Sequence, residues 1–430
     1  MAVPMLLFGG LAIGLLGCAG SSDDEASAPE ATAAATAEAA SAATTAPAST
    51  TTEAMAAPLV PLEVAQIPGD PKDFSVSALR QGADAPLLPD PLIDPAEIIS
   101  GGPPPDGIPP IDSPDFERAS EVDWLERQEA VVTINLGGDA RAYPTQVMIW
   151  HEIVNDTVNG EAVTVTYCPL CNSAIGYYRQ LDGRTFTFGT SGRLYNSSLI
   201  MYDRQTESLW THFTGQAVAG ELTGAQLELI PVATVSFETF VAEHPDGLVL
   251  SRPVGSGRSY GSNPYAGYDD PDGSPILFLG TPDPRLGAQT RVVAIRHGGE
   301  GVAVVLDALA AEGVIATEVG GVTAVAFHLP GTATPIQDSQ VAFGRDVGGT
   351  GVFNATVDGE VLTFSRKADA ASSAGIGAFT DDQTGSTWTV LGRAVDGPLA
   401  GTLLEPIEHL DTFWFAAAAF DPDIEIIGGP

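Results

Sequence analysis

The sequence predicts a mainly β fold with a few helices (α+β), built from two tandem, internally duplicated β-rich units that form a pseudo-symmetric pair. Short runs in which β-branched and aromatic residues alternate with polar ones fill most of the chain, and such alternation is typical of half-buried strands. Glycine-rich turns separate these runs about every 8–12 residues. The third observation is that several segments recur in one order in the two halves of the chain.

The duplication rests on segment pairs that keep both their order and their character. Both members of the first pair below read as strand, Gly-Gly turn and strand, which is a hairpin pattern. A chance origin of so many collinear matches is improbable. The pairs are AVVTINLGGDARAYP (130–144) with RVVAIRHGGEGVAVV (291–305), VNGEAVTVTYCP (158–169) with VGGVTAVAFHLP (319–330), DRQTESLWT (203–211) with DDQTGSTWT (381–389), GQAVAGELTG (215–224) with GRAVDGPLAG (392–401), and FETFVAEHPDGLVL (237–250) with FWFAAAAFDPDIEI (413–426).

Composition divides the chain into six parts. A stretch without aromatic residues cannot bury an apolar face and is expected to be disordered, and a proline-rich stretch cannot form central strands. The expected parts are a lipoprotein signal peptide (1–18), a disordered Ala/Thr/Ser/Glu tether (19–57), an extended Pro-rich segment (58–115), a first β-rich unit carrying a Cys/His site (116–259), a connecting segment (260–284) and a second β-rich unit that is a degenerate copy (285–430).

The N-terminus has the features of an export signal. Residues 1–17 are almost wholly apolar and too few to span a bilayer as a stable helix. They end in Leu-Leu-Gly-Cys, which matches the lipobox of bacterial lipoproteins, with Cys18 as the residue that carries the lipid. We therefore expect an extracytoplasmic protein that is anchored to the cell membrane through its N-terminal lipid, in a compartment where disulfides can form.

The charge balance narrows the range of partners. The chain has 55 acidic and 18 basic residues, for a formal net charge of −37. Such a surface repels phosphate backbones, so we do not expect the protein to bind nucleic acid. The sequence identifies no protein partner.

Helical signals are few among the strands. The best are PTQVMIWHEIV (144–154) and SFETFVAEH (236–244). In the second, Ser236 is placed to cap the helix N-terminus and Glu238 lies in the first turn. We expect one or two such helices in each unit.

The pair Cys168 and Cys171, in Cys-Pro-Leu-Cys, is the main candidate site. The duplication supplies an internal control, because residues shared by both halves should mostly serve the fold. At the offset of the first two pairs Cys168 faces Leu329 and His151 faces Glu312, and at the offset of the third pair His212 faces Val390, while Cys171 has no cysteine counterpart. Any Cys/His chemistry is therefore expected in the first unit.

Two of the four interpretations of this pair use both sulfurs chemically. A metal site would combine thiolate, imidazole and thioether ligands, a set that suits copper better than calcium or magnesium. A thiol redox pair would use the C-x-x-C spacing, on a scaffold unlike thioredoxin because a strand rather than a helix is expected after the pair. The metal ligands would be Cys168, Cys171, His151, His212 and Met201.

The other two interpretations need one reactive sulfur or none. A nucleophile would be Cys168 with His151 as its base, and with Asp156 or Asp203 orienting the histidine. A bland turn, with or without a disulfide, is also compatible with the spacing. A disulfide that closes so short a loop would stabilise the fold by at most about 2 kcal/mol.

Several segments together resemble an uncharacterised prokaryotic family, domain-of-unknown-function family 3179, over about residue 107 to the C-terminus. Many members of that family look like exported proteins or lipoproteins, which agrees with the N-terminal signal, but the resemblance implies no established activity. The segments are IPPIDSPDF (108–116), ARAYP (140–144), WHEIVNDTVNGEAVTVTYCPLCNSAIGYYR (150–179), FGTSGRLYNSSLIMYDRQTESLWT (188–211), GSNPYAGY (261–268) and FWFAAAAFDPD (413–423).

The leading hypothesis is thus an extracytoplasmic lipoprotein with a Cys/His site for a copper-type metal or for thiol redox chemistry. Cys168 and His151 would carry any catalysis. The alternatives are a non-catalytic envelope binding module, with a cleft between the two units, and a cysteine-nucleophile enzyme.

Overall fold

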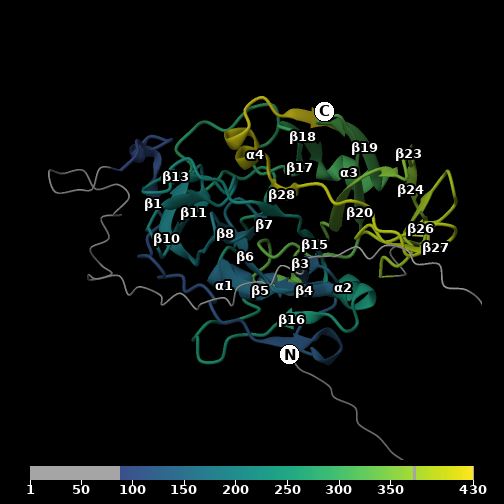
Figure 1. The fold of residues 1–430 in the computed structure, drawn as a ribbon, viewed down its shortest axis with the longest axis horizontal. Helices are drawn as coiled ribbons and strands as arrows, with labels where there is room; N and C mark the ends of the chain where they lie inside the picture. The colour runs from purple at the N-terminus through teal and green to yellow at the C-terminus, as the bar shows by residue number, and fades with distance from the viewer. Residues whose placement is uncertain (1–87, 371–373, 430) are drawn as a thin grey trace, which may run out of the picture. The chain divides into compact units, whose positions relative to one another are not determined.

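Short strands and a few one-to-two-turn helices form the computed structural model, which describes residues 88–370 and 374–429 (Figure 1). Within this part the chain is mainly β, as predicted. The predicted lipid-carrying Cys18 and the tether lie outside the described residues. None of the helices in the described part is long and apolar enough to cross a membrane. The α-helices there are α1 (Thr145–His151), α2 (Phe237–Glu243), α3 (Leu306–Glu312) and α4 (Trp414–Phe420), and the 3-10 turns are η2 (Pro95–Glu97), η3 (Ala119–Glu121) and η4 (Val341–Phe343).

Three sheets and a small ribbon form the first unit. The first sheet has the order β15 (Ala233–Ser236), β3 (Ala130–Leu136), β4 (Asp139–Pro144), β16 (Leu248–Leu250) and β2 (Phe116–Arg118). The second has the order β14 (Leu229–Ile230), β7 (Ser173–Tyr178), β6 (Glu161–Cys168) and β5 (Ile153–Val158). The third has the order β1 (Ile99–Ser100), β10 (Phe188–Tyr195), β11 (Ser198–Asp203), β12 (Leu209–Thr211) and β13 (Ala217–Ala219), and the ribbon pairs β8 (Gln180–Leu181) with β9 (Arg184–Thr185).

The second unit has a matching set of sheets. Its first sheet has the order β28 (His409–Phe413), β17 (Arg291–His297), β18 (Glu300–Val305) and β29 (Glu425–Ile427). Its second has the order β19 (Val314–Val319), β20 (Val322–Leu329) and β21 (Gly349–Asn354). Its third has the order β24 (Phe364–Arg366), β25 (Phe379–Asp381), β26 (Thr387–Trp388) and β27 (Ala394–Asp396), and its ribbon pairs β22 (Thr356–Val357) with β23 (Glu360–Val361).

The order of elements is the same in both units. A hairpin, β3–β4 or β17–β18, leads into a helix, α1 or α3, and then into a second hairpin, β5–β6 or β19–β20. The last short strand of each unit pairs in parallel with the second strand of the first hairpin. Contacts between the units are reciprocal, because β15 lies against β21 and β28 lies against β7. The duplication inferred from sequence offers one explanation of this repeated order.

The residues that the two units share serve the fold. The buried Trp210 donates a hydrogen bond from Nε1 to Oδ2 of Asp203 at 2.9 Å, and the buried Trp388 does the same to Asp381 at 2.9 Å. Each aspartate also accepts from the backbone N–H of the threonine three residues later, at 2.6 Å in both units. A buried carboxylate with several donors holds the turn between β11 and β12, or β25 and β26, in one conformation.

Both helices predicted for the first unit are confirmed, with tighter ends. Helix α2 begins after Ser236, whose hydroxyl oxygen accepts a hydrogen bond from the N–H of Thr239 at 3.2 Å, as an N-cap does. Residues 189–193 lie inside β10, and β10 pairs with β11 on both sides of an irregularity between Thr190 and Arg193. Such a bulge is invisible to local sequence signals.

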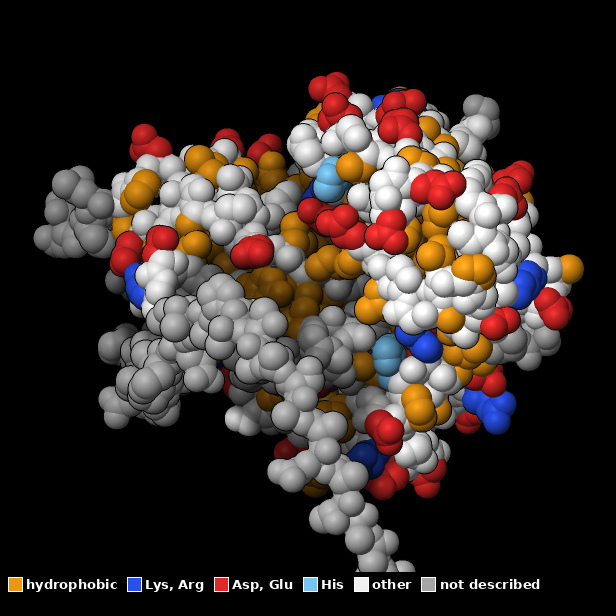
Figure 2. All heavy atoms as spheres, turned by 45° about the vertical axis from the view of Figure 1, so that its right-hand side comes forward, with side chains coloured by type: hydrophobic (Ala, Val, Ile, Leu, Met, Phe, Trp, Pro, Cys, Tyr) orange, Lys and Arg blue, Asp and Glu red, His pale blue; other side chains and the backbone are white. Residues whose placement is uncertain are grey.

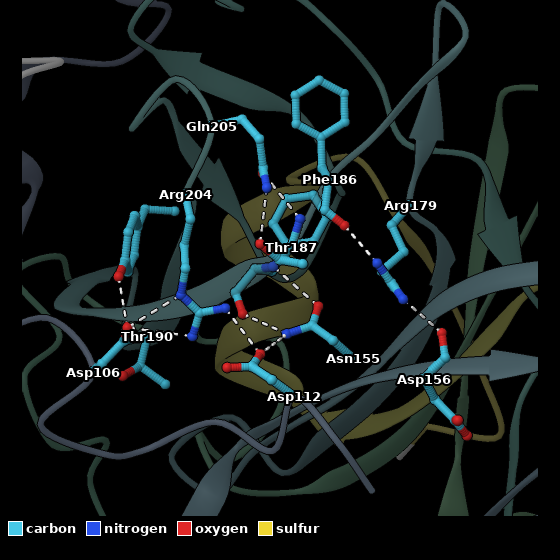
Figure 3. A network of polar contacts seen from close by, with 12 residues as sticks. Asp106, Asp112, Asn155, Asp156, Arg179, Phe186, Thr187, Thr190, Arg204 and Gln205 are labelled. Carbon is cyan, nitrogen blue, oxygen red and sulfur yellow. Dashed lines mark hydrogen bonds and ion pairs between the residues drawn. The ribbon is translucent and has the colours of Figure 1, made fainter. Parts of the chain in front are cut away.

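A buried arginine fastens the described end of the Pro-rich segment to the third sheet of the first unit (Figure 3). Arg204 donates to Oδ1 of Asp112 at 2.9 Å and to Oδ2 of Asp106 at 3.3 Å. Asn155 on β5 donates to the same Asp112 oxygen at 2.8 Å. Nearby, Arg179 is buried and donates to three backbone carbonyls rather than to a carboxylate. We interpret this network as structural.

The acidic composition shows on the surface. In Figure 2 the Asp and Glu side chains are spread over the visible face, and Lys and Arg side chains are few. The Lys and Arg side chains do not gather into a basic patch on that face.

Candidate functional site

The two cysteines lie on either side of a tight connection between β6 and β7. Cys168 is the last residue of β6 and pairs with Ser173, the first residue of β7, so only residues 169–172 bridge the strands. Asn172 takes a left-handed conformation, with φ of 49°, which lets the chain reverse. The equivalent hairpin of the second unit joins Leu329 to Gly349 through residues 330–348. The short connection therefore brings Cys171 back over its own sheet.

Both thiols are free, buried and adjacent. The described residues contain no disulfide between them. A side-chain hydrogen bond couples the pKa values of the two thiols, and the Cys171 Sγ lies 3.8 Å from the carbonyl oxygen of Cys168. The Cys171 Sγ also lies 3.0 Å from the Ser173 Oγ and 3.5 Å from the Ser198 Oγ, which comes from β11. A second sulfur and two hydroxyls thus surround the Cys171 sulfur.

A chain of hydrogen bonds joins Cys171 to His212. The Ser173 Oγ lies 2.9 Å from the His212 Nε2, and the His212 Nδ1 lies 2.8 Å from the Thr166 Oγ1. The Thr166 hydroxyl donates its one proton to the carbonyl of Ile175 at 3.0 Å, so it accepts from Nδ1–H. Nε2 is then unprotonated and accepts from Ser173, whose oxygen accepts from the Cys171 thiol. We assign the relay as Cys171 to Ser173 to His212 on this basis.

The backbone holds His212 at the end of this relay. It directly follows β12, its N–H donates to the Leu199 carbonyl at 3.0 Å, and its own carbonyl accepts from the Tyr177 hydroxyl at 2.7 Å. The side chain is completely buried. Three strands, β7, β11 and β12, therefore contribute to a fixed position for the imidazole.

Burial and hydrogen bonding separate the ionisation of the groups. Burial raises the pKa of Cys171, but its hydrogen bonds with Cys168, Ser173 and Ser198 outweigh burial and lower the pKa below its ordinary value. Burial, followed by the bond to Cys171, raises the pKa of Cys168. Burial lowers the pKa of His212 to about 4, so the imidazole is neutral at pH 7 and its unprotonated nitrogen can accept a hydrogen bond. Cys171 is therefore the sulfur better stabilised as a thiolate.

The second unit lacks every polar member of this group. By the matching registers of β6 with β20 and of β7 with β21, Thr166 corresponds to Phe327, Ser173 to Gly349 and Cys168 to Leu329. The position of His212 after the Asp–Trp turn is taken by Val390. The first unit has a polar cluster and the second unit an apolar cluster at equivalent positions, so the fold does not require the polar cluster.

The structure gives other partners to several residues that the sequence suggested. His151 is buried at the end of α1, where Nδ1 lies 2.6 Å from the Pro109 carbonyl and Nε2 lies 2.7 Å from the Tyr260 hydroxyl. Neither ring nitrogen contacts a cysteine sulfur. Met201 on β11 is buried in the same large apolar core as the cysteines.

The orienting carboxylates suggested for a nucleophilic triad are also engaged elsewhere. Asp156 accepts from Arg141 at 2.8 Å and from the Tyr143 hydroxyl at 2.7 Å. Asp203 is bound in the turn with Trp210. The structure therefore brings together Cys168, Cys171 and His212, and it does not join them to His151 or to these aspartates.

The copper site expected from the sequence stays a prediction. Within the described residues there is no group of three or more His, Cys, Asp and Glu side chains arranged to hold a metal. Ser173 lies between Cys171 and His212 and hydrogen-bonds to both. The ligand arrangement expected from sequence thus is not formed by the described side chains.

The buried imidazole of His212 is neutral in the folded protein, so acid should destabilise the fold. Its pKa is about 4 when folded and 6.5 as the ordinary value, so the unfolded chain binds the proton first as the pH falls. The free energy of unfolding therefore keeps its full value above pH 6.5 and falls by about 3 kcal/mol as the pH declines toward 4.

His212→Gln should remove that part of the pH dependence. Chemical denaturation at several pH values, with wild type and variant compared at each pH, measures it. Parallel curves for the two proteins between pH 7 and pH 4 would contradict the assigned burial of a neutral imidazole.

A segment with three tyrosines covers the cysteine turn. The Tyr268 hydroxyl donates to the Leu170 carbonyl at 2.8 Å, inside the Cys-Pro-Leu-Cys turn. The next residue, Asp269, is buried and accepts from Arg291 and Arg345, both at 2.9 Å. The connecting segment is thereby tied to the second unit while it touches the site of the first.

A groove lies between the two units, away from the cysteine pair. Its volume is about 470 Å³, and both units line it. One oxygen of the buried Glu243, Oε1, has no hydrogen-bond partner among the described residues, and Oε2 lies 3.5 Å from Arg393. The remaining lining is largely apolar and includes Ile134, Val232, Phe353, Leu391 and Leu404.

These observations define a duplicated-looking β scaffold with one buried dithiol and its hydrogen-bonded histidine. Comparison with known proteins identifies the family: the chain belongs to the family described as "Protein of unknown function (DUF3179)", which matches residues 105–424. No curated protein and no solved structure matched the chain. The match confirms the family resemblance seen in the sequence segments.

Proposed function

We propose that the protein is a thiol–disulfide exchange protein whose redox couple is Cys168 and Cys171. The observation that carries this proposal is the pair of free, hydrogen-bonded thiols joined through Ser173 to His212. Two adjacent sulfurs can form a disulfide without rearranging the strands, and stabilising one of them as a thiolate promotes exchange. A purely structural turn would not need Thr166, Ser173 and His212, because the second unit has non-polar residues at the three equivalent positions.

The reaction exchanges one disulfide for another. In the oxidising direction the Cys168 sulfur attacks a disulfide on a partner, that S–S bond breaks, and the partner sulfur that leaves takes up the proton that the Cys168 thiol gives up. Cys171 then loses its proton through Ser173 to His212 and attacks the Cys168 sulfur. The mixed disulfide breaks, and the second partner thiolate leaves with the proton. The partner disulfide is reduced to two thiols while the two protein thiols are oxidised to one disulfide.

The two sulfurs have different roles because their surroundings differ. In the reducing direction a partner thiolate attacks Cys168, and Cys171 is the leaving group. A leaving sulfur departs faster when its pKa is low, and Cys171 is the sulfur with the lowered pKa. Both sulfurs are buried, so a protein partner would reach Cys168 after the covering segment around Tyr268 is displaced.

Exchange with a small disulfide tests the proposal. The folded protein with Cys18→Ser, so that only Cys168 and Cys171 remain, is treated with glutathione disulfide and analysed by intact mass. We expect a product lighter by two hydrogen atoms, with the reduced mass restored by a dithiol reductant. Thiols that stay reduced in the folded protein, and react only after unfolding, would overturn the proposal.

A second candidate function is ligand binding in the groove between the units. The groove supports it by its volume of about 470 Å³ and by the unpaired Oε1 of the buried Glu243, a combination of apolar lining and few polar groups that is common in ligand sites. Loss of binding of a neutral hydrophobic dye on Leu404→Asp, with exchange activity retained, would separate this function from the first.

The N-terminal signal supports an extracytoplasmic location, where a dithiol couple meets disulfide-bearing partners. We propose that lipid on Cys18 anchors the protein to the membrane. In cells that process lipoproteins, Cys18→Ser should move most of the protein from the membrane fraction to the soluble extracytoplasmic fraction. Equal distribution of wild type and variant after fractionation would refute the anchor.

A further inference from the structure

Three exposed apolar residues lie close together in the connecting segment. Ile276, Leu277 and Leu279 are 46%, 41% and 65% exposed, and they are three of the eight large hydrophobic side chains that are exposed among the described residues. Single exposed apolar side chains are normal on a soluble protein, whereas a cluster of them marks a contact with another molecule. We call these three residues the apolar patch.

The backbone of the patch is held in place by its neighbours. Leu277 has φ of 56°, in the left-handed region where a side chain costs energy. The next residue, Phe278, packs edge-to-face on Phe415 of α4, with ring centroids 5.4 Å apart. On the other side, the Ile276 carbonyl accepts a hydrogen bond from the Ser197 hydroxyl at 2.5 Å. Leu277 is thus kept both strained and exposed, which is a reason to look for a function.

One hydroxyl group links the patch to the cysteine turn. The Tyr268 hydroxyl accepts a hydrogen bond from the Ile276 N–H at 3.3 Å and donates one to the Leu170 carbonyl, between the two cysteines, at 2.8 Å. Tyr268 is buried, whereas the patch is exposed. The patch is therefore the solvent-facing part of the segment that covers the thiols, and a movement of Ile276 is transmitted to the turn through Tyr268.

From this arrangement we propose that the apolar patch is the docking surface for the polypeptide that carries the partner disulfide. This inference rests on the proposed exchange function and names the class of its partner. Because both thiols are buried, the partner has to displace the covering segment before its disulfide meets Cys168. The patch is the part of that segment that a partner can bind from solvent. Docking that moves residues 276–279 withdraws Tyr268 from Leu170, so binding of the partner opens the site.

The charges beside the patch narrow the class of partner. Asp270 and Asp272 are exposed on the same segment, and the chain as a whole has a formal net charge of −37. Such a surface attracts a basic polypeptide and repels an acidic one. It also repels an anionic membrane surface, which favours a polypeptide over lipid as the molecule that covers the patch. The partner class is therefore a polypeptide with apolar and basic residues next to its disulfide.

Matched peptide disulfides test this docking surface. The probes are the disulfide dimers of Lys-Leu-Cys-Phe-Lys, of the polar Lys-Ser-Cys-Ser-Lys and of the acidic Glu-Leu-Cys-Phe-Glu. Each rate of oxidation of the folded Cys18→Ser protein is divided by the rate with glutathione disulfide. We expect the apolar basic dimer to react at least about 10-fold faster than the polar dimer, because it buries large side chains on the patch. Its advantage over the acidic dimer should shrink as salt is added.

Two substitutions in the patch separate docking from folding. Leu279→Asp should remove the preference for the apolar dimer over the polar dimer. Leu277→Gly should weaken that preference without lowering the melting temperature, because glycine relieves the positive φ. Val361→Asp is the matched control, since Val361 is 50% exposed on β23 of the second unit, and it should leave every rate ratio unchanged.

The possible failures are distinct. If glutathione disulfide oxidises the folded protein while Leu279→Asp keeps the full preference for the apolar dimer, the docking surface is refuted and the redox couple stands. If no probe oxidises the folded protein, the exchange function fails and the docking surface fails with it. Equal rates with all peptides, together with Leu279-dependent binding to phosphatidylcholine vesicles or Leu279-dependent dimerisation in sedimentation, would assign the patch to lipid or to a second copy of the chain and overturn the proposal.

Discussion

Cys171→Ser should capture the partner of Cys168 as a stable mixed disulfide. In the wild type, Cys171 lies beside Cys168, and the proposed exchange has it resolve the mixed disulfide within the molecule. A sulfur held at the point of reaction acts at a very high effective concentration. With serine in its place, release depends on external thiol, and we expect the adduct to persist at least about 1,000-fold longer.

The measurement is intact mass after treatment with glutathione disulfide in the Cys18→Ser background. Cys171→Ser should gain one glutathione, whereas the wild type should pass to the internal disulfide. Cys168→Ser is the matched control, and it should gain little, because the proposal gives Cys168 and not Cys171 the role of meeting the partner disulfide. Equal, stable adducts on both single variants would show that the sulfurs act independently, contrary to the proposed roles.

Asp269→Asn should be among the most destabilising substitutions. Asp269 is buried and accepts from Arg291, which is also buried, and from Arg345. Burial raises its pKa, but Arg291 and Arg345 outweigh it and hold the pKa below its ordinary value. Removing the carboxylate leaves the Arg291 guanidinium buried without its counter-charge, at a cost of about 3–5 kcal/mol in the free energy of unfolding.

Asp283→Asn provides the comparison, because Asp283 pairs with the partly exposed Arg285 and such pairs contribute at most about 1 kcal/mol. Chemical denaturation measures both. Since Tyr268 beside Asp269 contacts the cysteine turn, Asp269→Asn should also speed alkylation of Cys168 in the folded protein. Similar small effects of the two substitutions would contradict the importance of this ion pair for the connecting segment.

Much of the scaffold followed from local sequence patterns. The hairpin over residues 130–144 and the helix capped by Ser236 need only alternation, a Gly-Gly turn and a capping hydroxyl to be predicted. The bulged strand over residues 188–195 could not be predicted in this way. Its conformation depends on pairing with a second strand and on the Pro-rich segment that packs against it.

The candidate site was predicted in part. The contrast between the two halves pointed to Cys168, Cys171 and His212, which the structure brings together. It also pointed to His151, whose ring instead contacts Pro109 and Tyr260. Those partners lie far from His151 in the sequence, so no local pattern could reveal them.

The hydroxyl groups of the site were missed for a related reason. Ser173 and Ser198 come from different strands, and serine is common on exposed strands and turns, so neither stands out in the sequence.

The most direct test of the central claim is the redox equilibrium of the folded Cys18→Ser protein in glutathione buffers, read by intact mass. A reversible Cys168–Cys171 couple predicts one two-electron transition, with the potential shifting by about 30 mV for each tenfold change in the ratio of oxidised to reduced protein, and its loss in Cys168→Ser. A folded protein whose two thiols stay reduced at every buffer ratio would contradict it.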